Sequence, residues 1–274
     1  MIIACFDGMT ENIFNNIIEY LPNHQVLLND SNYKHSILYN ENLPHTVPSW
    51  IQIFSGKTYK DTGIYDFEKR NRDGSRLNEY VKRKDLQGIE FIWDKSNQNR
   101  FIVYNLWICI PPLRINCHYP LIWTQWDVLK KNGEEFIFEL CSEINSYKWC
   151  IDTLLKMRCE VLIWHCLFPD QIHHAFSYEE KYNKPISDKF IKAYKAVDFL
   201  LGKMIKQNDD VVIVSDHGDC GAAFEEIGLV EPICAHNRDG FIASNFLSEL
   251  PSNHSEMYLM FEKYLMKEKI KRRN

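Results

Sequence analysis

Acidic and histidine side chains recur directly after apolar runs in this sequence, in a pattern suited to metal binding. The side chains concerned are Asp7, Asp170, His174, Asp216, His217 and His236. Mixed nitrogen and oxygen donors suit Zn²⁺ or Mn²⁺, and six of them are more than one zinc ion normally takes. The set therefore predicts two divalent ions that share one site, an arrangement that stabilises both the entering and the leaving oxygen in phosphoryl transfer.

A threonine is the candidate nucleophile for such chemistry. Thr46 precedes an apolar, helix-like run that Gly56 closes, and Pro48 is tolerated in a first helical turn. The N–H groups and the dipole at a helix N-terminus favour bound anions, and a metal ion would lower the pKa of the hydroxyl enough to make it reactive. A plain N-cap threonine would give the same local pattern, so both interpretations stay open from these residues alone.

Two of the candidate ligands are spaced for a single helical turn. Asp170 and His174 are four residues apart, and both would lie on one face if a helix starts at Pro169. His173 competes with His174 for the same role, and the spacing favours His174 only slightly.

Alternating apolar and helical segments are expected to position these residues. We expect strands at residues 2–6, 36–40, 101–105, 160–165 and 211–214, and helices at 11–20, 134–157 and 187–205. We expect residues 92–94 to begin another helical stretch and the charged residues 68–76 to form a surface loop. The alternation predicts an α/β domain with a mainly parallel sheet covered on both faces. The candidate ligands would then gather at the carboxyl ends of its strands.

Composition narrows the class of protein. The 274 residues are 45% hydrophobic, which suffices for one substantial core, and we see no domain boundary between residues 1 and 274. The net charge of −5 argues against stable nucleic-acid binding, and no apolar run is long enough for a membrane span. The nine cysteines include no C-x-x-C pair. With no recognisable signal peptide, these features favour a cytoplasmic location, and the sequence leaves the oligomeric state open.

Several motifs together resemble a known family. They are Asp7-Gly8, Thr46-Val-Pro-Ser-Trp, Gly63-Ile64-Tyr65-Asp66-Phe67, Asp170-x-x-x-His174, Ser215-Asp216-His217-Gly218 and His236-x-x-x-Gly240. In this order they resemble the type I phosphodiesterase/nucleotide pyrophosphatase family of the alkaline phosphatase superfamily, especially its prokaryotic branch. The resemblance spans residues 2 to about 243. It implies a three-layer αβα sandwich of the alkaline-phosphatase type.

The resemblance also implies roles for the candidate residues. Asp7, Thr46, Asp216 and His217 would hold one metal ion, most readily Zn²⁺, and Asp170, His174 and His236 the other. That choice leaves His173 as a neighbour of the ligands or a substrate contact. Thr46 would attack phosphorus in line and form a phosphothreonine intermediate. The implied substrate is a small phosphodiester or pyrophosphate, with nucleotides favoured.

Departures from the family pattern bear on the substrate. Thr62 stands where the family often has histidine, and Asp219 adds a carboxylate that disfavours a highly anionic substrate. A small cap or lid would have to come from residues 68–130, where the aromatic segment 113–128 is either a lid or a packed loop. The alternatives are a phosphomonoesterase, a phosphonate hydrolase or a lipid or glycan phosphodiesterase. A binding module that has lost activity is disfavoured because all the candidate ligands are present.

Overall fold

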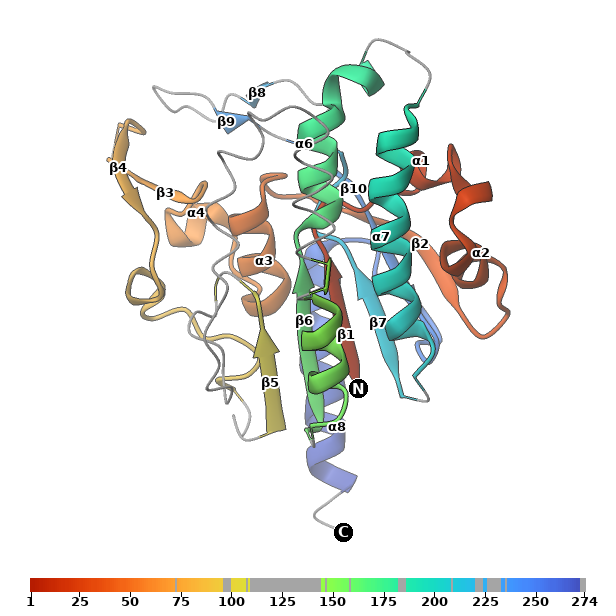
Figure 1. The fold of residues 1–274 in the computed structure, drawn as a ribbon. Helices are drawn as coiled ribbons and strands as arrows, with labels where there is room; N and C mark the ends of the chain where they lie inside the picture. Colours follow the sequence, from red (N-terminus) through yellow and green to blue (C-terminus); the bar gives the residue numbers. More distant parts are fainter. Residues whose placement is uncertain are drawn as a thin grey trace.

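The computed structural model describes residues 1–71, 73–95, 100–106, 108, 144–145, 147–157, 159–181, 186–207, 209–219, 224–225, 233–234 and 236–271. A six-stranded sheet runs through the centre of the molecule in the order β2-β10-β7-β1-β6-β5 (Figure 1). Its strands are β1 (Ile2–Phe6), β2 (Lys34–Tyr39), β5 (Phe101–Tyr104), β6 (Val161–Cys166), β7 (Val211–Val214) and β10 (Asp239–Ser244). Only β10 runs antiparallel to its neighbours. The predicted α/β class with a mainly parallel sheet is confirmed.

The central strands are apolar throughout because both faces of the sheet are covered. Every residue of β1, β6 and β7 is buried. Strands that lack a polar face cannot lie against water on either side, and such strands are typical of parallel sheets in α/β proteins. This is why the runs Ile2–Phe6 and Val211–Val214 could be assigned from sequence alone.

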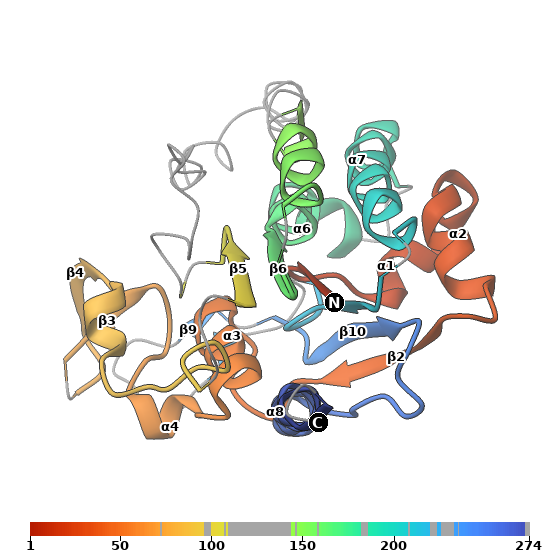
Figure 2. The ribbon, with the colours of Figure 1, turned by 90° about the horizontal axis from the view of Figure 1, so that it is seen from below.

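Helices form a layer on each face of the sheet (Figure 2). One layer holds α1 (Glu11–Asn15), α2 (Pro22–Asn29), α6 (Phe168–Lys181) and α7 (Asp188–Ile205), which pack in one apolar cluster. The other layer holds α3 (Thr46–Ser55) and α8 (His254–Lys271), which pack in a second cluster. Gly56 ends α3 at φ 71°, and a Cβ there would lie 2.8 Å from the ring of Tyr258 on α8. The result is the three-layer sandwich expected from the sequence.

Polar segments beside the sheet form smaller elements. They are η1 (Ile18–Tyr20), α4 (Tyr59–Thr62), β3 (Glu68–Arg70), β4 (Arg76–Tyr80), η2 (Arg83–Leu86), and the pair β8 (Phe224–Glu225) and β9 (Ile233–Cys234). β3 and β4 pair as an antiparallel hairpin. The prediction of a plain surface loop at residues 68–76 was therefore wrong. Ion pairs such as Lys69 with Asp85 hold this exposed hairpin instead of an apolar face.

Two other local predictions also need correction. The helix expected at residues 11–20 stops at Asn15, and a separate 3₁₀ turn, η1, follows it. Residues 92–94 form a turn, in which Ile92 and Trp93 are buried in the core. Their apolar spacing therefore reflects packing and not a helix. The aromatic segment 113–128, and the first part of the helix expected at 134–157, lie outside the described residues; residues 147–154 are helical as expected.

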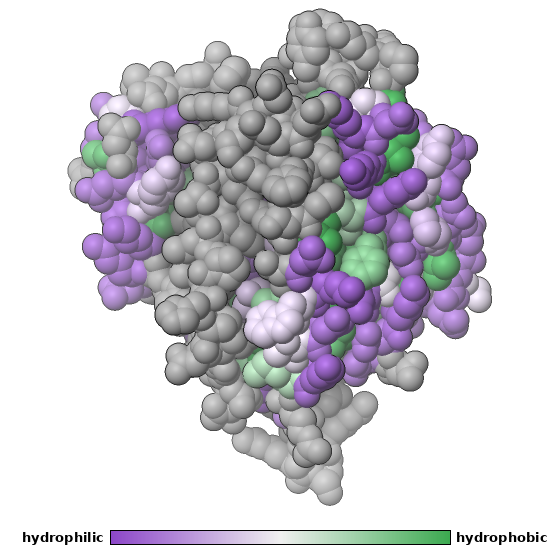
Figure 3. Space-filling model, viewed as in Figure 1, coloured by the Kyte–Doolittle hydropathy of each residue, from purple (hydrophilic) through white to green (hydrophobic). Residues whose placement is uncertain are grey.

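The surface over α2 and α7 is mainly hydrophilic (Figure 3). Single apolar side chains occur there, and Phe199 lies beneath the ammonium groups of Lys148 and Lys203. In the described part of the chain, no helix is both long enough and apolar enough to cross a membrane.

Candidate active site

Three adjacent strands deliver the predicted carboxylates to one edge of the sheet. Asp7 directly follows β1, Asp216 follows β7, and Asp170 lies in the first turn of α6 after β6. Since β7, β1 and β6 are parallel neighbours, their carboxyl ends meet at the same edge. The segments are joined directly, because the Asp170 amide donates a hydrogen bond of 3.0 Å to the Asp7 carbonyl.

A glycine permits this close approach. Gly8 has φ 68°, a conformation that residues with a side chain rarely adopt. A Cβ at Gly8 would also lie 3.0 Å from Cβ of Asp170. Both the turn after β1 and the contact with α6 therefore require glycine at this position.

Thr46 is the first residue of α3 and is turned toward the carboxylates. His45 takes the N-cap position, so Thr46 lies at the helix N-terminus as expected but is not the cap. Its hydroxyl Oγ1 lies 3.4 Å from Asp7 Oδ1 and 3.3 Å from His217 Nε2. The side chain is buried, at 3% exposure. The helix thus brings the hydroxyl to the same point as the strand-end residues.

His217 lies at the centre of the first cluster. Its Nδ1 lies 2.8 Å from the Gly218 carbonyl, an oxygen that only accepts hydrogen bonds. Its Nε2 faces Asp7 Oδ1 at 3.1 Å and Asp216 Oδ2 at 3.3 Å. A histidine whose second nitrogen is fixed by a carbonyl is the usual arrangement of a metal ligand.

The electrostatics favour a positive charge at this point. Burial opposes protonation of His217, but the charges of Asp216 and Asp7 raise its pKa to about 10. Burial and the neighbouring Asp7 charge raise the pKa of Asp216 well above its usual range. Burial alone would raise the pKa of Asp7 too, yet hydrogen bonds from His165 and His217 lower it to about 2. Buried carboxylates this close together need a cation, either a proton or a metal ion.

The second cluster adjoins the first. Asp170 Oδ2 lies 3.4 Å from His174 Nε2, and Asp170 Oδ1 lies 3.5 Å from His236 Nδ1. The His236 ring stacks on the His217 ring, with centroids 4.1 Å apart. The His236 amide donates to the Pro44 carbonyl, which ties the loop before β10 to the start of α3. All the sequence-predicted ligands are thus brought together from five separate segments.

Two groups have the mutual distances of metal-binding sets, within the described residues. They are Asp170, His174 and His236, and Asp7, Asp170 and His217; in each, the ligand atoms lie within 4.8 Å of one another. Asp170 belongs to both, which the sequence did not indicate. Among the described residues of the clusters, three buried atoms have these ion-pair contacts but make no hydrogen bond: Asp170 Oδ1, Asp216 Oδ2 and His236 Nδ1. Buried polar atoms nearly always have partners, so these orphaned acceptors fit bound divalent metal.

Comparison with known proteins supplies the family. Residues 1–223 match the sequence profile of the type I phosphodiesterase/nucleotide pyrophosphatase family. The chain belongs to this family. The family's description names phosphodiesterases and nucleotide pyrophosphatases, and the side-chain groups described above could hold metal ions. No curated protein matches the chain significantly.

A solved structure also resembles the chain, at low identity. It is the phosphonoacetate hydrolase from Sinorhizobium meliloti 1021 in complex with phosphonoformate, with 12% identity and a TM-score of 0.47. The match covers 79% of this chain and 55% of the other, so the chain spans about half the length of that protein.

Two further residues of the candidate site, which the sequence did not indicate, contact Asp7 and Asp216. His165, at the end of β6, contacts Asp7 Oδ2 at 3.1 Å. Asn40 donates to the Asp216 carbonyl at 3.0 Å and to Ser49 Oγ of α3 at 2.8 Å. It therefore connects the segment after β7 with the helix that carries Thr46. A polar residue at the end of an apolar strand was the only local signal for either of them.

His173 points away from the cluster. Its Nε2 lies 2.7 Å from the Tyr194 hydroxyl of α7, and the ring is wholly buried among the helices on that side. Burial lowers the pKa of His173 to about 3. This orientation favours a structural role and leaves His174 as the histidine of α6 that reaches Asp170.

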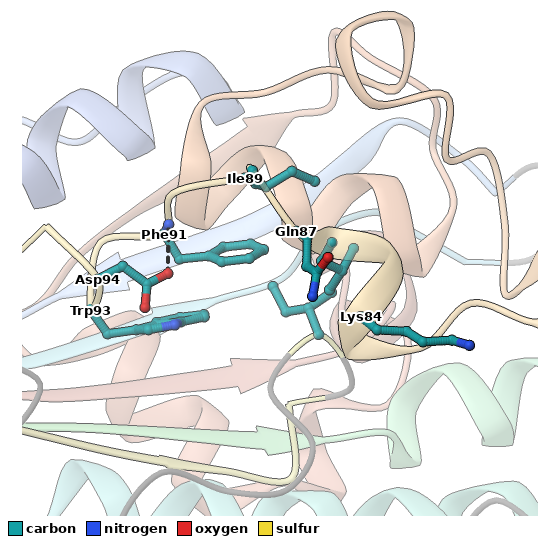
Figure 4. A pocket seen from close by; sticks show the side chains of 9 residues that line it. Lys84, Gln87, Ile89, Phe91, Trp93 and Asp94 are labelled. Carbon is teal, nitrogen blue, oxygen red and sulfur yellow. Dashed lines mark hydrogen bonds between the residues drawn. The ribbon is translucent and has the colours of Figure 1, made fainter.

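A separate pocket of about 400 Å³ lies between η2 and the turn at residues 91–94 (Figure 4). Phe91 and Trp93 stack there, with ring centroids 4.9 Å apart, and the Phe91 amide donates to Asp94 Oδ2. None of its lining residues is a candidate ligand. The pocket is thus distinct from the candidate active site.

Proposed function

We propose that this protein hydrolyses phosphodiester or pyrophosphate bonds of small substrates, nucleotides being favoured, with Thr46 as the nucleophile. One observation carries the proposal: the Thr46 hydroxyl, at a helix N-terminus, lies within 3.4 Å of both Asp7 and His217. Buried ligand atoms that make no hydrogen bond belong to the same two clusters. A hydroxyl among metal-ligand groups is the arrangement needed to activate a weak nucleophile.

Two divalent ions, most readily Zn²⁺ and alternatively Mn²⁺, fit the donor set. In this proposal Asp7, Thr46, Asp216 and His217 hold one ion, and Asp170, His174 and His236 hold the other. Asp170 belongs to both metal-binding groups, so its carboxylate would be available as a ligand to either ion. When bound, the ions would lower the pKa of the Thr46 hydroxyl and offset the charge that develops on the phosphoryl and leaving oxygens.

The protein's own groups would complete the reaction. Thr46 Oγ1 attacks phosphorus while the bond to the leaving oxygen breaks, and a water later hydrolyses the phosphothreonine. The Val47 N–H belongs to the first turn of α3, where amides have no partner within the helix. It can donate to a phosphoryl oxygen on which charge builds in the transition state. The helix dipole favours an anion at the same position.

The charge around Thr46 supports a diester over a monoester. Lys57 lies beyond the carboxyl end of α3. Thr46 lies at the other end, roughly 15 Å away at 1.5 Å per helical residue. Asp219, held by Asn237, adds a partly buried carboxylate near His217, and burial raises its pKa. A substrate with one negative charge at phosphorus suits these surroundings better than one with two.

In this proposal a cap within residues 68–130, of which 109–130 lie outside the described residues, would select the substrate. The β3–β4 hairpin begins directly after Phe67, whose ring lies 5.4 Å from that of His45, the neighbour of Thr46. This contact supports a position of the hairpin beside the nucleophile.

Hydrolysis of bis-p-nitrophenyl phosphate and p-nitrophenyl phosphate, with added Zn²⁺ or Mn²⁺, tests the proposal. We expect metal-dependent diester cleavage that falls at least 10³-fold in Thr46→Ala, because the nucleophile is lost. Thr153→Ala, an exposed threonine outside the site, serves as the matched control. Cleavage of the monoester alone would favour a phosphomonoesterase. If the wild-type protein takes up no metal and turns over neither substrate, the proposal that it is an enzyme is refuted.

A further inference from the structure

A buried histidine occupies an otherwise apolar layer behind the site. His165 is the fifth residue of β6, and side chains alternate between the two faces of a strand. Val161 and Ile163, on the same face, belong to the apolar cluster between the sheet and α3. His165 is fully buried in line with them. An imidazole in such a layer needs polar partners for both ring nitrogens.

Both nitrogens of His165 face oxygen atoms. Nδ1 lies 3.1 Å from the Asn105 carbonyl, and Nε2 lies 3.1 Å from Asp7 Oδ2. The indole of Trp50, on α3, packs edge-on against the imidazole at 5.1 Å, and its Nε1 lies 3.5 Å from the same Asp7 oxygen. The ring is therefore held on three sides, and one of its contacts is a candidate metal ligand.

The two oxygens of Asp7 have different surroundings as a result. Oδ2 faces His165 and Trp50, inside the core. Oδ1 faces Thr46 Oγ1 and His217 Nε2, inside the candidate site. A partial rotation of the carboxylate about its bond to the Cβ would break the core contacts, so these contacts fix the orientation in which the carboxylate faces the site.

We propose that His165 is a positioning residue that orients Asp7 for metal binding and for the approach of Thr46. The inference rests on the proposed function, because it takes Asp7 as a ligand. Groups that hydrogen-bond to a metal ligand from outside typically change metal affinity 10- to 100-fold when they are replaced. His165 is suited to this role because its ring is rigid and has no access to water.

A matched pair of variants tests the role. His165→Met and His165→Gln have side chains of similar length, but only glutamine keeps an N–H near the position of the imidazole Nε2. Zinc affinity is measured by competition with a chromogenic chelator. We expect 10- to 100-fold weaker binding in His165→Met and near-wild-type binding in His165→Gln. His165→Leu replaces the methionine variant if that variant does not fold.

A second buried histidine provides the control. His24 is also fully buried, and its Nδ1 lies 2.8 Å from Asp198, far from the site in the α2–α7 contact. His24→Leu is expected to lower stability in urea and to leave zinc affinity unchanged. Equal zinc affinity in the wild type and His165→Met would overturn the positioning role of His165, and so would equally weak binding in the methionine and glutamine variants. Either outcome would leave the proposed function standing. Absence of zinc uptake by the wild type would overturn the proposed function as well.

Discussion

At the residue scale, the backbone conformation at Gly8 and the arrangement of charges are linked. The positive φ of Gly8 brings the loop after β1 against Asp170, and this contact sets the separation of Asp7 and Asp170. The Gly8 amide also lies 3.4 Å from Asp216 Oδ1. Gly8 therefore contacts two of the three carboxylates, Asp170 and Asp216, and directly follows the third, Asp7.

Gly8→Ala separates this role from ordinary backbone strain. Gly63 has nearly the same φ, 70°, but a Cβ there meets nothing within 4 Å. Both alanine variants should lose about 1–2 kcal/mol of stability from the left-handed conformation. Only Gly8→Ala should also lose zinc affinity and diester cleavage, by tenfold or more, because its Cβ displaces Asp170. Equal zinc affinity in the two variants would contradict this interpretation.

At the element scale, one helix supplies the cap of another. The N-cap residue of α2, Leu21, has no side chain that can accept hydrogen bonds. Asp198 of α7 accepts instead from the amides of Asn23 and His24 and from the His24 ring. Burial alone would raise the pKa of Asp198, but the hydrogen bonds from His24 and Asn23 lower it. The carboxylate thus joins two helices and completes the start of α2.

Asp198→Ala should destabilise the protein by about 2–3 kcal/mol, because it leaves buried donors without their charged acceptor. Asp188→Ala, on the exposed first turn of the same helix, is the control and should cost about 0.3–1 kcal/mol. Urea denaturation at pH 7 measures both. Since the folded pKa of Asp198 is lowered, its contribution is present above its unfolded pKa and is lost as the pH falls through the folded value. Equal effects of the two substitutions would refute the capping role.

At the scale of the whole molecule, several buried histidines link stability to pH. His254, at the start of α8, is fully buried. Burial lowers its pKa to about 4, although the nearby Glu41 charge opposes this and the His217 charge adds to it. The unfolded chain would bind a proton near pH 6.5, whereas the folded one would not. Stability is therefore full above that pH and declines as the pH falls toward 4.

The His254→Leu variant tests this linkage. The unfolding free energy of the wild type should fall between pH 6.5 and 4, and His254 should account for about 1.4 kcal/mol per pH unit of that slope. The unfolding free energy of the leucine variant should change less steeply over that range. Between pH 7.5 and 8.5 the slopes of the two proteins should be the same. Urea denaturation at closely spaced pH values provides the measurement. Parallel curves for the two proteins would show that the His254 ring is protonated in the fold.

Much of this arrangement could be predicted from sequence because apolar runs end at the residues concerned. Asp7 and Asp216 follow runs that only a doubly covered strand explains, so their place at the sheet edge followed from local pattern. The β3–β4 hairpin was missed because its strands are polar and its stability comes from ion pairs. His165 was missed because its partners, Asp7 and Asn105, are 158 and 60 residues away in sequence. Contacts of that range leave no periodic signal.

The order of the strands has a consequence for synthesis of the chain. β1 pairs with β6 on one side and β7 on the other, so its nearest partner in sequence begins at Val161. At about 5–20 residues per second, a ribosome needs roughly 8–30 s to supply that partner. During this interval Ile2–Phe6, wholly apolar, can pair with no neighbour in the native sheet. β1 is thus made well before it can be enclosed, and the nascent chain must keep it from association with other chains until β6 emerges.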